Sequence, residues 1–196
     1  MGQYYKTVIV PTESETGIED IKIYKVDNDC GFSDWIGLKL MEHSYLNNEW
    51  TDSIAKFIYK KKVRMAHVGD YADEYPQYQL AYNQYVSRNK IEADIYDEDG
   101  NFVRFDYHGK YLLNYDKKLY IYFDKYKKES PSCWNDDVTV CPFTLLTALG
   151  NGRGGGDYYG NLPNEDLVGS WAWDEISIED SAPADFAEYP VYFTEK

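Results

Sequence analysis

The sequence predicts an α+β fold, a single domain over residues 1–196 in which a mainly antiparallel or mixed sheet is covered by a few helices. Short runs of β-branched and aromatic residues, bounded by turn residues, outnumber the segments with helical spacing. Aromatic residues make up 17% of the chain and include 21 tyrosines, which suits half-buried strands. With 43% apolar residues, a chain of 196 residues can form a core without disulfides.

The N-terminal part of the chain contains predicted elements of both kinds. Residues 3–10 form a strand, and residues 21–26 return as a second strand to give an opening hairpin. Apolar residues recur at helical spacing in 36–45. They do so again in 47–62, where the helix ends in lysines that suit its negative C-terminus.

The rest of the chain alternates strands, turns and helices. A buried strand at 63–68 is expected to end in a turn at Gly69 and Asp70, because both residues favour tight turns. Pro142 suits the first turn of a helix that ends at Leu149, with Gly150 as its left-handed cap. The other expected elements are a helix at 78–86, a strand at 91–95, a turn at 97–101, a strand at 102–107, a hairpin at 110–123 that turns at 116–118, and strands at 167–178 and 189–196.

The chain is strongly acidic, with a formal net charge of −14 and a pI near 4.5. This charge argues against direct binding to nucleic acid and against attachment to anionic membranes. It fits solubility alone, or binding to a basic protein partner. No apolar run approaches a membrane span, and the N-terminus lacks the pattern of a signal peptide, so a cytoplasmic location is expected. The sequence does not define the oligomeric state.

The cysteines and histidines predict no metal site, and no cofactor is expected. Cys30, Cys133 and Cys141 are an odd set without CxxC spacing, as expected for free thiols in a reducing compartment. The three histidines have no paired spacing either. His67 falls within a predicted strand and is expected to be a core residue with satisfied hydrogen bonds.

The candidate site is centred on a glycine-rich loop, "LGNGRGGGDYYG", at 149–160. The consecutive residues Gly154, Gly155 and Gly156 let backbone amides point together and bind an anion, and Arg153 adds a planar fork for phosphate or carboxylate. The loop lacks the Gly-Lys-Ser/Thr ending of a Walker A loop and the strand-loop-helix context of a dinucleotide fingerprint. A flexible surface loop is the alternative interpretation.

The polar and aromatic residues that end the same loop suggest what the ligand contains. Asp157 can accept hydrogen bonds from ribose hydroxyls or fix Arg153. Tyr158 and Tyr159 can stack on a base. Together with an anion-binding loop, these residues point to a nucleotide-like ligand.

A second segment, "HVGDYADEY" at 67–75, supplies Asp70 and Tyr71 just after the buried strand. Asp70 can act as a general base, a metal ligand or a ribose acceptor, or it can simply cap the turn through its own backbone amides. Gln3 and Tyr4 begin the chain near a sheet edge, where they can add amide and hydroxyl contacts.

Trp171 is the candidate wall for a flat ligand, and it is expected to share one face of its strand with Trp173. Core packing of both indoles is the alternative interpretation of this pair.

Several motifs resemble those of a family of uncharacterised microbial and phage proteins. Its members begin Met-Gly-Gln-Tyr followed by Trp or Tyr, and carry an Arg-Gly-Gly-Gly-Asp loop and a tryptophan strand of the form G-x-W-A-x-D-x-I. This chain has "MGQYYK", "LLTALGNGRGGGDY" and "VGSWAWDEI", together with "GLKLMEHSY" and "VGDYADE". In many members of the family the Gly-Asp-Tyr-Ala turn directly follows the tryptophan strand, whereas here it lies about a hundred residues upstream. The resemblance therefore implies that both segments meet at one site, but it implies no activity.

Three functions fit these residues. The first is a binding protein that holds, and sequesters, a small anionic and nucleotide-like ligand where the glycine-rich loop, Asp70 to Tyr71 and Trp171 converge. The second is a hydrolase or transferase at the same place, with Asp70 or Asp157 activating water or a ribose hydroxyl. The third is an acidic inhibitor of a nucleic-acid-binding protein, recognisable by steep salt dependence. Whether the protein is an enzyme is left open by the sequence.

Overall fold

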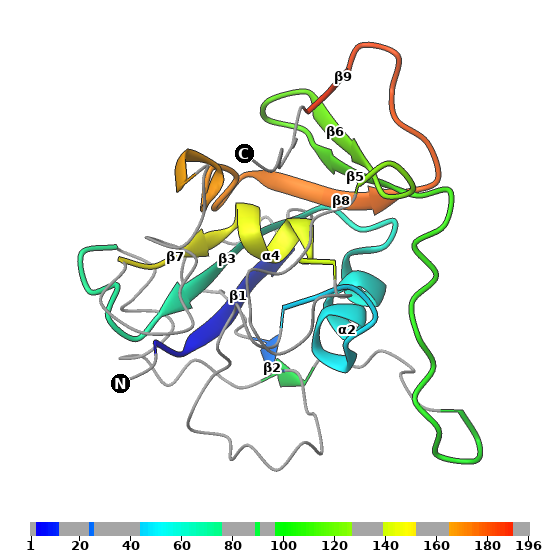
Figure 1. Cartoon of the computed structure of the whole chain (residues 1–196), viewed down its shortest axis with the longest axis horizontal. Coiled ribbons are helices and arrows are strands. Elements are labelled where there is room, and N and C mark those ends of the chain that lie inside the picture. The colour runs from blue at the N-terminus through cyan, green and yellow to red at the C-terminus, as the bar shows by residue number, and fades with distance from the viewer. Residues whose placement is uncertain are drawn as a thin grey trace.

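The computed structural model of the chain describes residues 3–11, 24–25, 44–75, 89–90, 97–126, 139–151 and 165–189 (Figure 1). Within these residues the fold is α+β, as predicted, with one mixed seven-stranded sheet, a separate pair of short strands and two α-helices. The strands are β1 (Tyr5–Pro11), β2 (Tyr24–Lys25), β3 (Val63–Gly69), β4 (Asn89–Lys90), β5 (Tyr111–Asn114), β6 (Leu119–Tyr122), β7 (Ala148–Leu149), β8 (Glu175–Glu179) and β9 (Ala187–Glu188). The helices are α2 (Glu49–Ile58) and α4 (Pro142–Leu146), and a single 3₁₀ turn is η3 (Glu165–Leu167).

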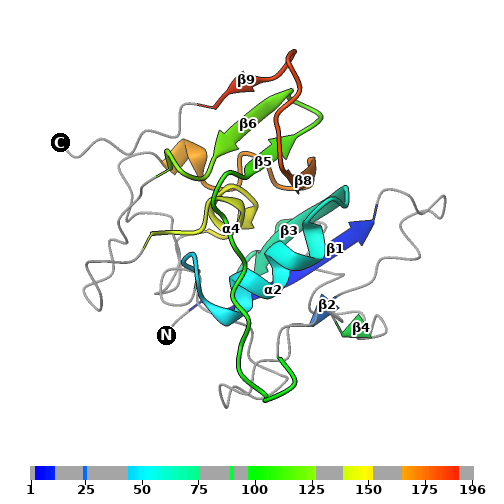
Figure 2. The same ribbon diagram turned by 90° about the vertical axis from the view of Figure 1, so that its right-hand side faces the viewer.

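The main sheet has the strand order β1-β3-β8-β5-β6-β9, and β7 pairs with β3 outside this path. Figure 2 shows this order from β9 at the top of the view to β1 lower down. Neighbouring strands are antiparallel except for β3 with β7 and β6 with β9, which are parallel. The short strands β2 and β4 pair in parallel as a sheet of their own.

Strand β3 is the point at which the sheet branches. One of its edges pairs with β1 along the whole strand. On the other edge its first two residues pair with β8, whereas His67 and Val68 pair with β7. Between these partners the carbonyl of Met65 accepts a hydrogen bond of 2.8 Å from the amide of Trp173. The strand is buried almost throughout, as its apolar sequence predicts.

Helix α2 forms because its apolar residues share one face and its first turn is capped. Trp50, Ile54 and Ile58 recur every four residues and are buried, and burying each such side chain contributes roughly 1.5–3 kcal/mol. Asn48 caps the helix, since its side chain accepts a hydrogen bond of 2.9 Å from the amide of Trp50. The helix ends at Ile58 because Tyr59 is extended and bridges to β8.

Two hydrophobic clusters lie on opposite faces of β1 and β3, because alternate residues of a strand face opposite ways. The larger is the main core, where Tyr5, Ile9 and Met65 pack with apolar residues of α2, α4 and β8. The other, here called the small cluster, consists of Val8, Ala66, Val68, Ala72 and Leu149, with Tyr75, Ala172 and Trp173 packed against it.

Residues 102–107 take no part in the main sheet, so the strand predicted there is wrong. They are held instead by a buried carboxylate on α2. Asp52 accepts hydrogen bonds from the amide of Phe105 at 3.1 Å and from the hydroxyl of Tyr107 at 2.9 Å. A side chain therefore satisfies the backbone amide of Phe105, which a strand would have paired with a neighbour.

The opening hairpin is also wrong, because β1 pairs with β3 and β2 pairs with β4. The predicted elements that are confirmed are the strand at 3–10, the helix within 47–62, the strand at 63–68 with its turn, the turn at 97–101 and the hairpin within 110–123. The predicted end of that helix in the lysines is wrong, because the helix ends at Ile58.

Two elements near the C-terminus are shorter than predicted. The helix that begins at Pro142 ends at Leu146, because Ala148 and Leu149 pair with β3, and Gly150 has no positive φ and is not a left-handed cap. Of the strand predicted at 167–178, only β8 forms, since 168–174 are turns.

The helix predicted at 78–86 and the strand predicted at 91–95 lie outside the described residues, as do most of 36–45 and 189–196. In the parts of the chain that the structure describes, no helix combines the length and the apolar character needed to cross a membrane.

Candidate functional site

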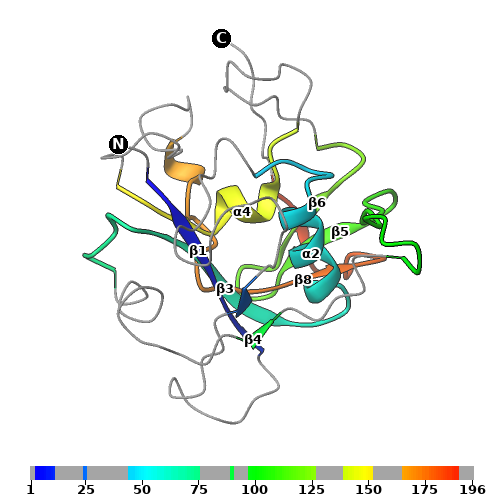
Figure 3. The same cartoon turned by 90° about the horizontal axis from the view of Figure 1, so that it is seen from below.

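Three segments that are far apart in the sequence meet at one end of the main sheet. They are the residues that lead into β1, the turn that follows β3 and the residues that follow β7. Figures 1 and 3 both show them on the same side of the molecule. The pairing explains this, because Tyr5 at the start of β1 lies opposite Gly69, and Leu149 at the end of β7 lies beside Val68.

Asp70 joins the turn after β3 to the start of the chain. Its amide donates to the carbonyl of Tyr4 at 2.9 Å, and its carboxylate Oδ1 accepts from the amide of Tyr4 at 3.0 Å. The two bonds extend the pairing of β1 and β3 beyond Gly69. The carboxylate of Asp70 therefore caps the N-terminal segment, whereas the turn itself is closed by a bond of 3.0 Å from the amide of Ala72 to the carbonyl of Gly69.

Gly69 is required because the side chain of Gln3 lies directly against its backbone. A Cβ atom at Gly69 would come within 2.3 Å of Gln3 Nε2 and 2.7 Å of Gln3 Cδ. Gln3 is fully buried, and its Oε1 accepts a hydrogen bond of 3.3 Å from the hydroxyl of Tyr5. The glutamine thus packs into the space that a side chain at residue 69 would fill.

The turn after β3 also contacts the start of the glycine-rich stretch. The side-chain amide of Asn151 donates a hydrogen bond to the carbonyl of Tyr71. Arg153, Gly154, Gly155, Gly156, Asp157 and Tyr158 lie outside the described residues. Asn151 stands two residues before Arg153, so the chain enters this stretch from beside the Asp70 turn.

Trp171 does not share a face with Trp173, so that prediction is wrong. Trp171 is 1% exposed and belongs to the main core, where its ring lies 5.2 Å from that of Tyr189. Trp173 is only partly buried and packs against the small cluster on the opposite face. The residues lie in a turn, not in a strand, and Trp173 has a φ of 69°. Side chains two residues apart share a face only in a strand, so the predicted common face of the two indoles does not form in this turn.

Burial makes the carboxyl group of Asp70 a weaker acid than an ordinary aspartate. Desolvation raises the pKa of its carboxyl group, and the hydrogen bond from the amide of Tyr4 offsets part of this rise. Burial therefore opposes ionisation of the Asp70 carboxyl group, whereas its hydrogen bond with Tyr4 favours the ionised form.

His67 is a core residue whose ring orientation is fixed by Thr147. The Thr147 hydroxyl donates to the carbonyl of Phe143 at 2.7 Å, so it must accept from His67 Nδ1, which lies 2.7 Å away. Nε2 is then an acceptor, and it has no hydrogen-bond partner among the described residues. The ring also contacts Trp50 edge-on. The expectation of fully satisfied hydrogen bonds is thus met at one nitrogen only.

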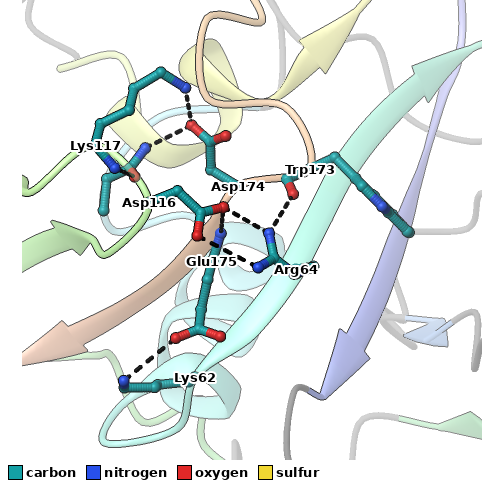
Figure 4. A network of polar contacts seen from close by, with 8 residues as sticks. Lys62, Arg64, Asp116, Lys117, Trp173, Asp174 and Glu175 are labelled. Atoms are coloured by element: carbon teal, nitrogen blue, oxygen red, sulfur yellow. Dashed lines mark hydrogen bonds and ion pairs between the residues drawn. The ribbon is translucent and has the colours of Figure 1, made fainter. Parts of the chain in front are cut away.

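A charged network ties the β5–β6 turn to β3 and to the turn before β8 (Figure 4). Arg64 Nη1 donates to Asp116 Oδ2 at 2.6 Å and to the carbonyl of Trp173 at 3.1 Å. Asp116 also accepts from the amide of Glu175 at 3.2 Å. The network fixes the backbone on both sides of Asp174.

Sequence reasoning missed Asn151, the contact of Gln3 with Gly69, and the network of Arg64. Asn151 belongs to the glycine-rich loop, but nothing in the sequence distinguishes its side-chain amide from those of other loop residues, because the contact depends on β7 lying beside β3. Among the described residues, no group of three His, Cys, Asp or Glu side chains could hold a metal ion. Cys141 is a free, buried thiol, whereas Cys30 and Cys133 lie outside the described residues.

Comparison with protein-family models, with curated proteins and with solved structures gives no match to this chain.

Proposed function

We propose that the protein binds and sequesters a small anionic, nucleotide-like ligand at the end of the sheet where β3 and β7 finish. The parallel pairing of these strands carries the proposal, because it starts the glycine-rich stretch beside the turn that contains Asp70 and Tyr71. In open α/β sheets, ligands bind beyond the carboxyl ends of parallel strands, and β3 and β7 end side by side in the same way.

The residue types that follow β7 suit negative charge. Consecutive glycines at 154–156 leave backbone amides without side-chain cover, and Arg153 supplies a guanidinium that can bind phosphate through two hydrogen bonds. In a chain with a net charge of −14, an anion needs such a local receptor to overcome general repulsion.

Asp70 and Gln3 support this site by holding its frame. The carboxylate of Asp70 is bonded to the amide of Tyr4, which stabilises its negative charge. Gln3, packed against Gly69, holds the N-terminal segment against the same turn. Under this proposal Asp157 accepts from ligand hydroxyls, and Tyr4 and Tyr71 border the site.

One observation favours a second function at the same place, hydrolysis or group transfer on a phosphorylated substrate. The pKa of Asp70 is raised by burial, as is typical of a group that takes up a proton from water or from a ribose hydroxyl. In that case the ligand leaves the site chemically changed.

Native mass spectrometry of the protein recovered from its natural host tests the proposal. A bound small molecule is expected on the wild-type protein and is expected to be lost from Arg153→Ala. The matched control is Arg104→Ala, which removes an exposed arginine from a described segment away from the site and should retain the molecule. Retention by Arg153→Ala would contradict the proposal.

Reincubation of the released molecule with fresh protein separates the two functions. An unchanged mass indicates binding alone, whereas a changed mass indicates catalysis and should then be abolished by Asp70→Asn.

A further inference from the structure

Two buried polar side chains of the main sheet, Thr7 of β1 and His67 of β3, each carry a polar atom that the rest of the described chain leaves unpaired. His67 is fully buried and Thr7 is 5% exposed. Neither Thr7 Oγ1 nor His67 Nε2 has a hydrogen-bond partner among the described residues. Buried polar groups in folded proteins are almost always bonded to protein or to ordered water, because burying them unpaired is costly.

The register of β1 and β3 places these two side chains next to each other. Thr7 lies directly opposite His67. Opposite side chains of an antiparallel pair stand on the same face of the sheet, with their Cβ atoms about 4.5–5.5 Å apart. Tyr5 and Ile9, which share the face of Thr7 because each lies two residues away from it, belong to the main core. The two unpaired atoms therefore lie on the main-core face, between neighbouring strands.

The ring of His67 turns its unpaired nitrogen towards β1. Nδ1 donates to the hydroxyl of Thr147 at 2.7 Å, and the backbone amide of His67 donates to the carbonyl of the same residue at 2.9 Å. Thr147 immediately precedes β7, which pairs with the edge of β3 opposite to β1. Nδ1 and Nε2 lie on opposite sides of the imidazole ring, so Nε2 points away from β7 and towards Thr7.

The chemistry of the two atoms selects the ligand. Burial lowers the pKa of His67 to about 3, so the ring is neutral. With its proton on Nδ1, Nε2 can only accept, whereas the Thr7 hydroxyl can donate or accept. A water molecule can donate to Nε2 and bond the hydroxyl at the same time. A metal ion would need further ligands, and among the described residues no group of three His, Cys, Asp or Glu side chains could supply them.

From this geometry we infer that Thr7 and His67 form a binding site for a single buried water molecule between β1 and β3. The water donates one hydrogen bond to Nε2 and shares another with Thr7 Oγ1, and two polar partners are enough to hold water in an interior site. The two strands are thereby joined through side chains as well as through their backbones. This water site involves neither Asp70 nor the residues after β7, so it stands or falls independently of the proposed anion site.

Crystal structures at high resolution test the inference, with Thr7→Val as the main variant. The wild-type protein is expected to hold a water within hydrogen-bond distance, about 2.5–3.2 Å, of both atoms. Valine has nearly the shape of threonine but no hydroxyl group, so Thr7→Val should lose this water. Thr7→Ser keeps the hydroxyl group and should keep the water.

The matched control is Thr51→Val, which removes another buried hydroxyl group. Thr51 Oγ1 already bonds the carbonyls of Tyr45 and Asn48, so this variant should keep the water. Magnetic relaxation dispersion of the water signal, which detects long-lived internal water, should likewise decrease in Thr7→Val and not in Thr51→Val.

Three results would overturn the inference: a direct bond between Thr7 and His67, a different side chain bonded to Nε2, or water retained unchanged in Thr7→Val. If Thr7→Val does not fold, the wild-type structure alone decides, through the presence or absence of water at both atoms.

Discussion

Gly69→Ala is expected to destabilise the protein through one contact, that between residue 69 and Gln3. The new Cβ would lie 2.3 Å from Gln3 Nε2, 2.7 Å from Cδ and 3.0 Å from Cγ. Rotation of the amide alone cannot relieve three such distances. Because Gln3 is fully buried, the whole side chain must be displaced from its place beside Tyr5.

Two costs set the magnitude of this effect. Overpacking a buried site typically costs about 1–3 kcal/mol. Displacing Gln3 also breaks its bond with the Tyr5 hydroxyl, and a buried polar group left without a partner costs about 1–3 kcal/mol. A shift of Gln3 relieves the overpacking but breaks its hydrogen bond, so the two costs do not add in full. We therefore expect Gly69→Ala to lower the free energy of unfolding by about 2 kcal/mol.

A double-mutant cycle isolates the contact. In a Gln3→Ala background the space against Gly69 is empty, so Gly69→Ala should be neutral or stabilising by about 0.4–1 kcal/mol, because alanine restricts the unfolded chain more than glycine does. Urea denaturation of the four proteins, with m-values compared, gives the coupling energy. An equal cost of Gly69→Ala in both backgrounds would refute the packing of Gln3 against Gly69.

The remaining predictions concern two buried titratable groups. Burial lowers the pKa of His67 to about 3, so the stability that its neutral form contributes is present above pH 6.5 and is lost as the pH falls below it. Between pH 7 and pH 5 the wild-type protein should lose about 2 kcal/mol of stability relative to His67→Gln, measured by urea denaturation at each pH, and parallel pH profiles would contradict the burial of a neutral imidazole. Burial raises the pKa of Asp52, so its contribution has the opposite sign and increases as the pH falls from the folded pKa towards the unfolded value of 3.8. The stability of Asp52→Asn should lack that increase relative to the wild-type protein in the same titration, and an identical increase in both would show that the carboxyl group is not desolvated.

Elements with their own periodicity could be predicted from the sequence. α2 has apolar residues at helical spacing and an asparagine cap, and β3 is a mainly apolar strand that ends at Gly69, just before Asp70. The β5–β6 hairpin likewise contains its own turn. In each case the local pattern and the final packing require the same conformation.

Elements determined by distant partners could not be predicted. β7 is two residues long and is a strand only because His67 and Val68 lie beside it. A hairpin of β1 with the next predicted strand is the simplest local choice, but β1 pairs along its whole length with β3 instead. The turn at Trp173 depends on Met65 and Arg64, which are remote in the sequence, so alternation predicted the wrong face for its indole.

In the candidate site, too, the residues could be predicted from local sequence, whereas their contacts could not. The sequence singled out Asp70, Tyr71, Gln3 and Tyr4, and the structure brings these residues together at one sheet end. Their mutual contacts follow from strand register, which no local pattern encodes. The contribution of Arg153 and the glycines beside it stays a prediction.

An NMR titration of the ¹⁵N-labelled protein with AMP tests the central claim, that the sheet end at β3 and β7 receives an anion. Backbone amide signals of Gly69, Asp70, Tyr71, Gly150 and Asn151 are expected to shift in a saturable way. The amides of Gly109 and Lys117, which lie in the β5–β6 hairpin and its approach, should not move. Shifts confined to the hairpin or to α2, or no saturable shift at the end of β3 and β7, would show that no anion binds at this end of the sheet.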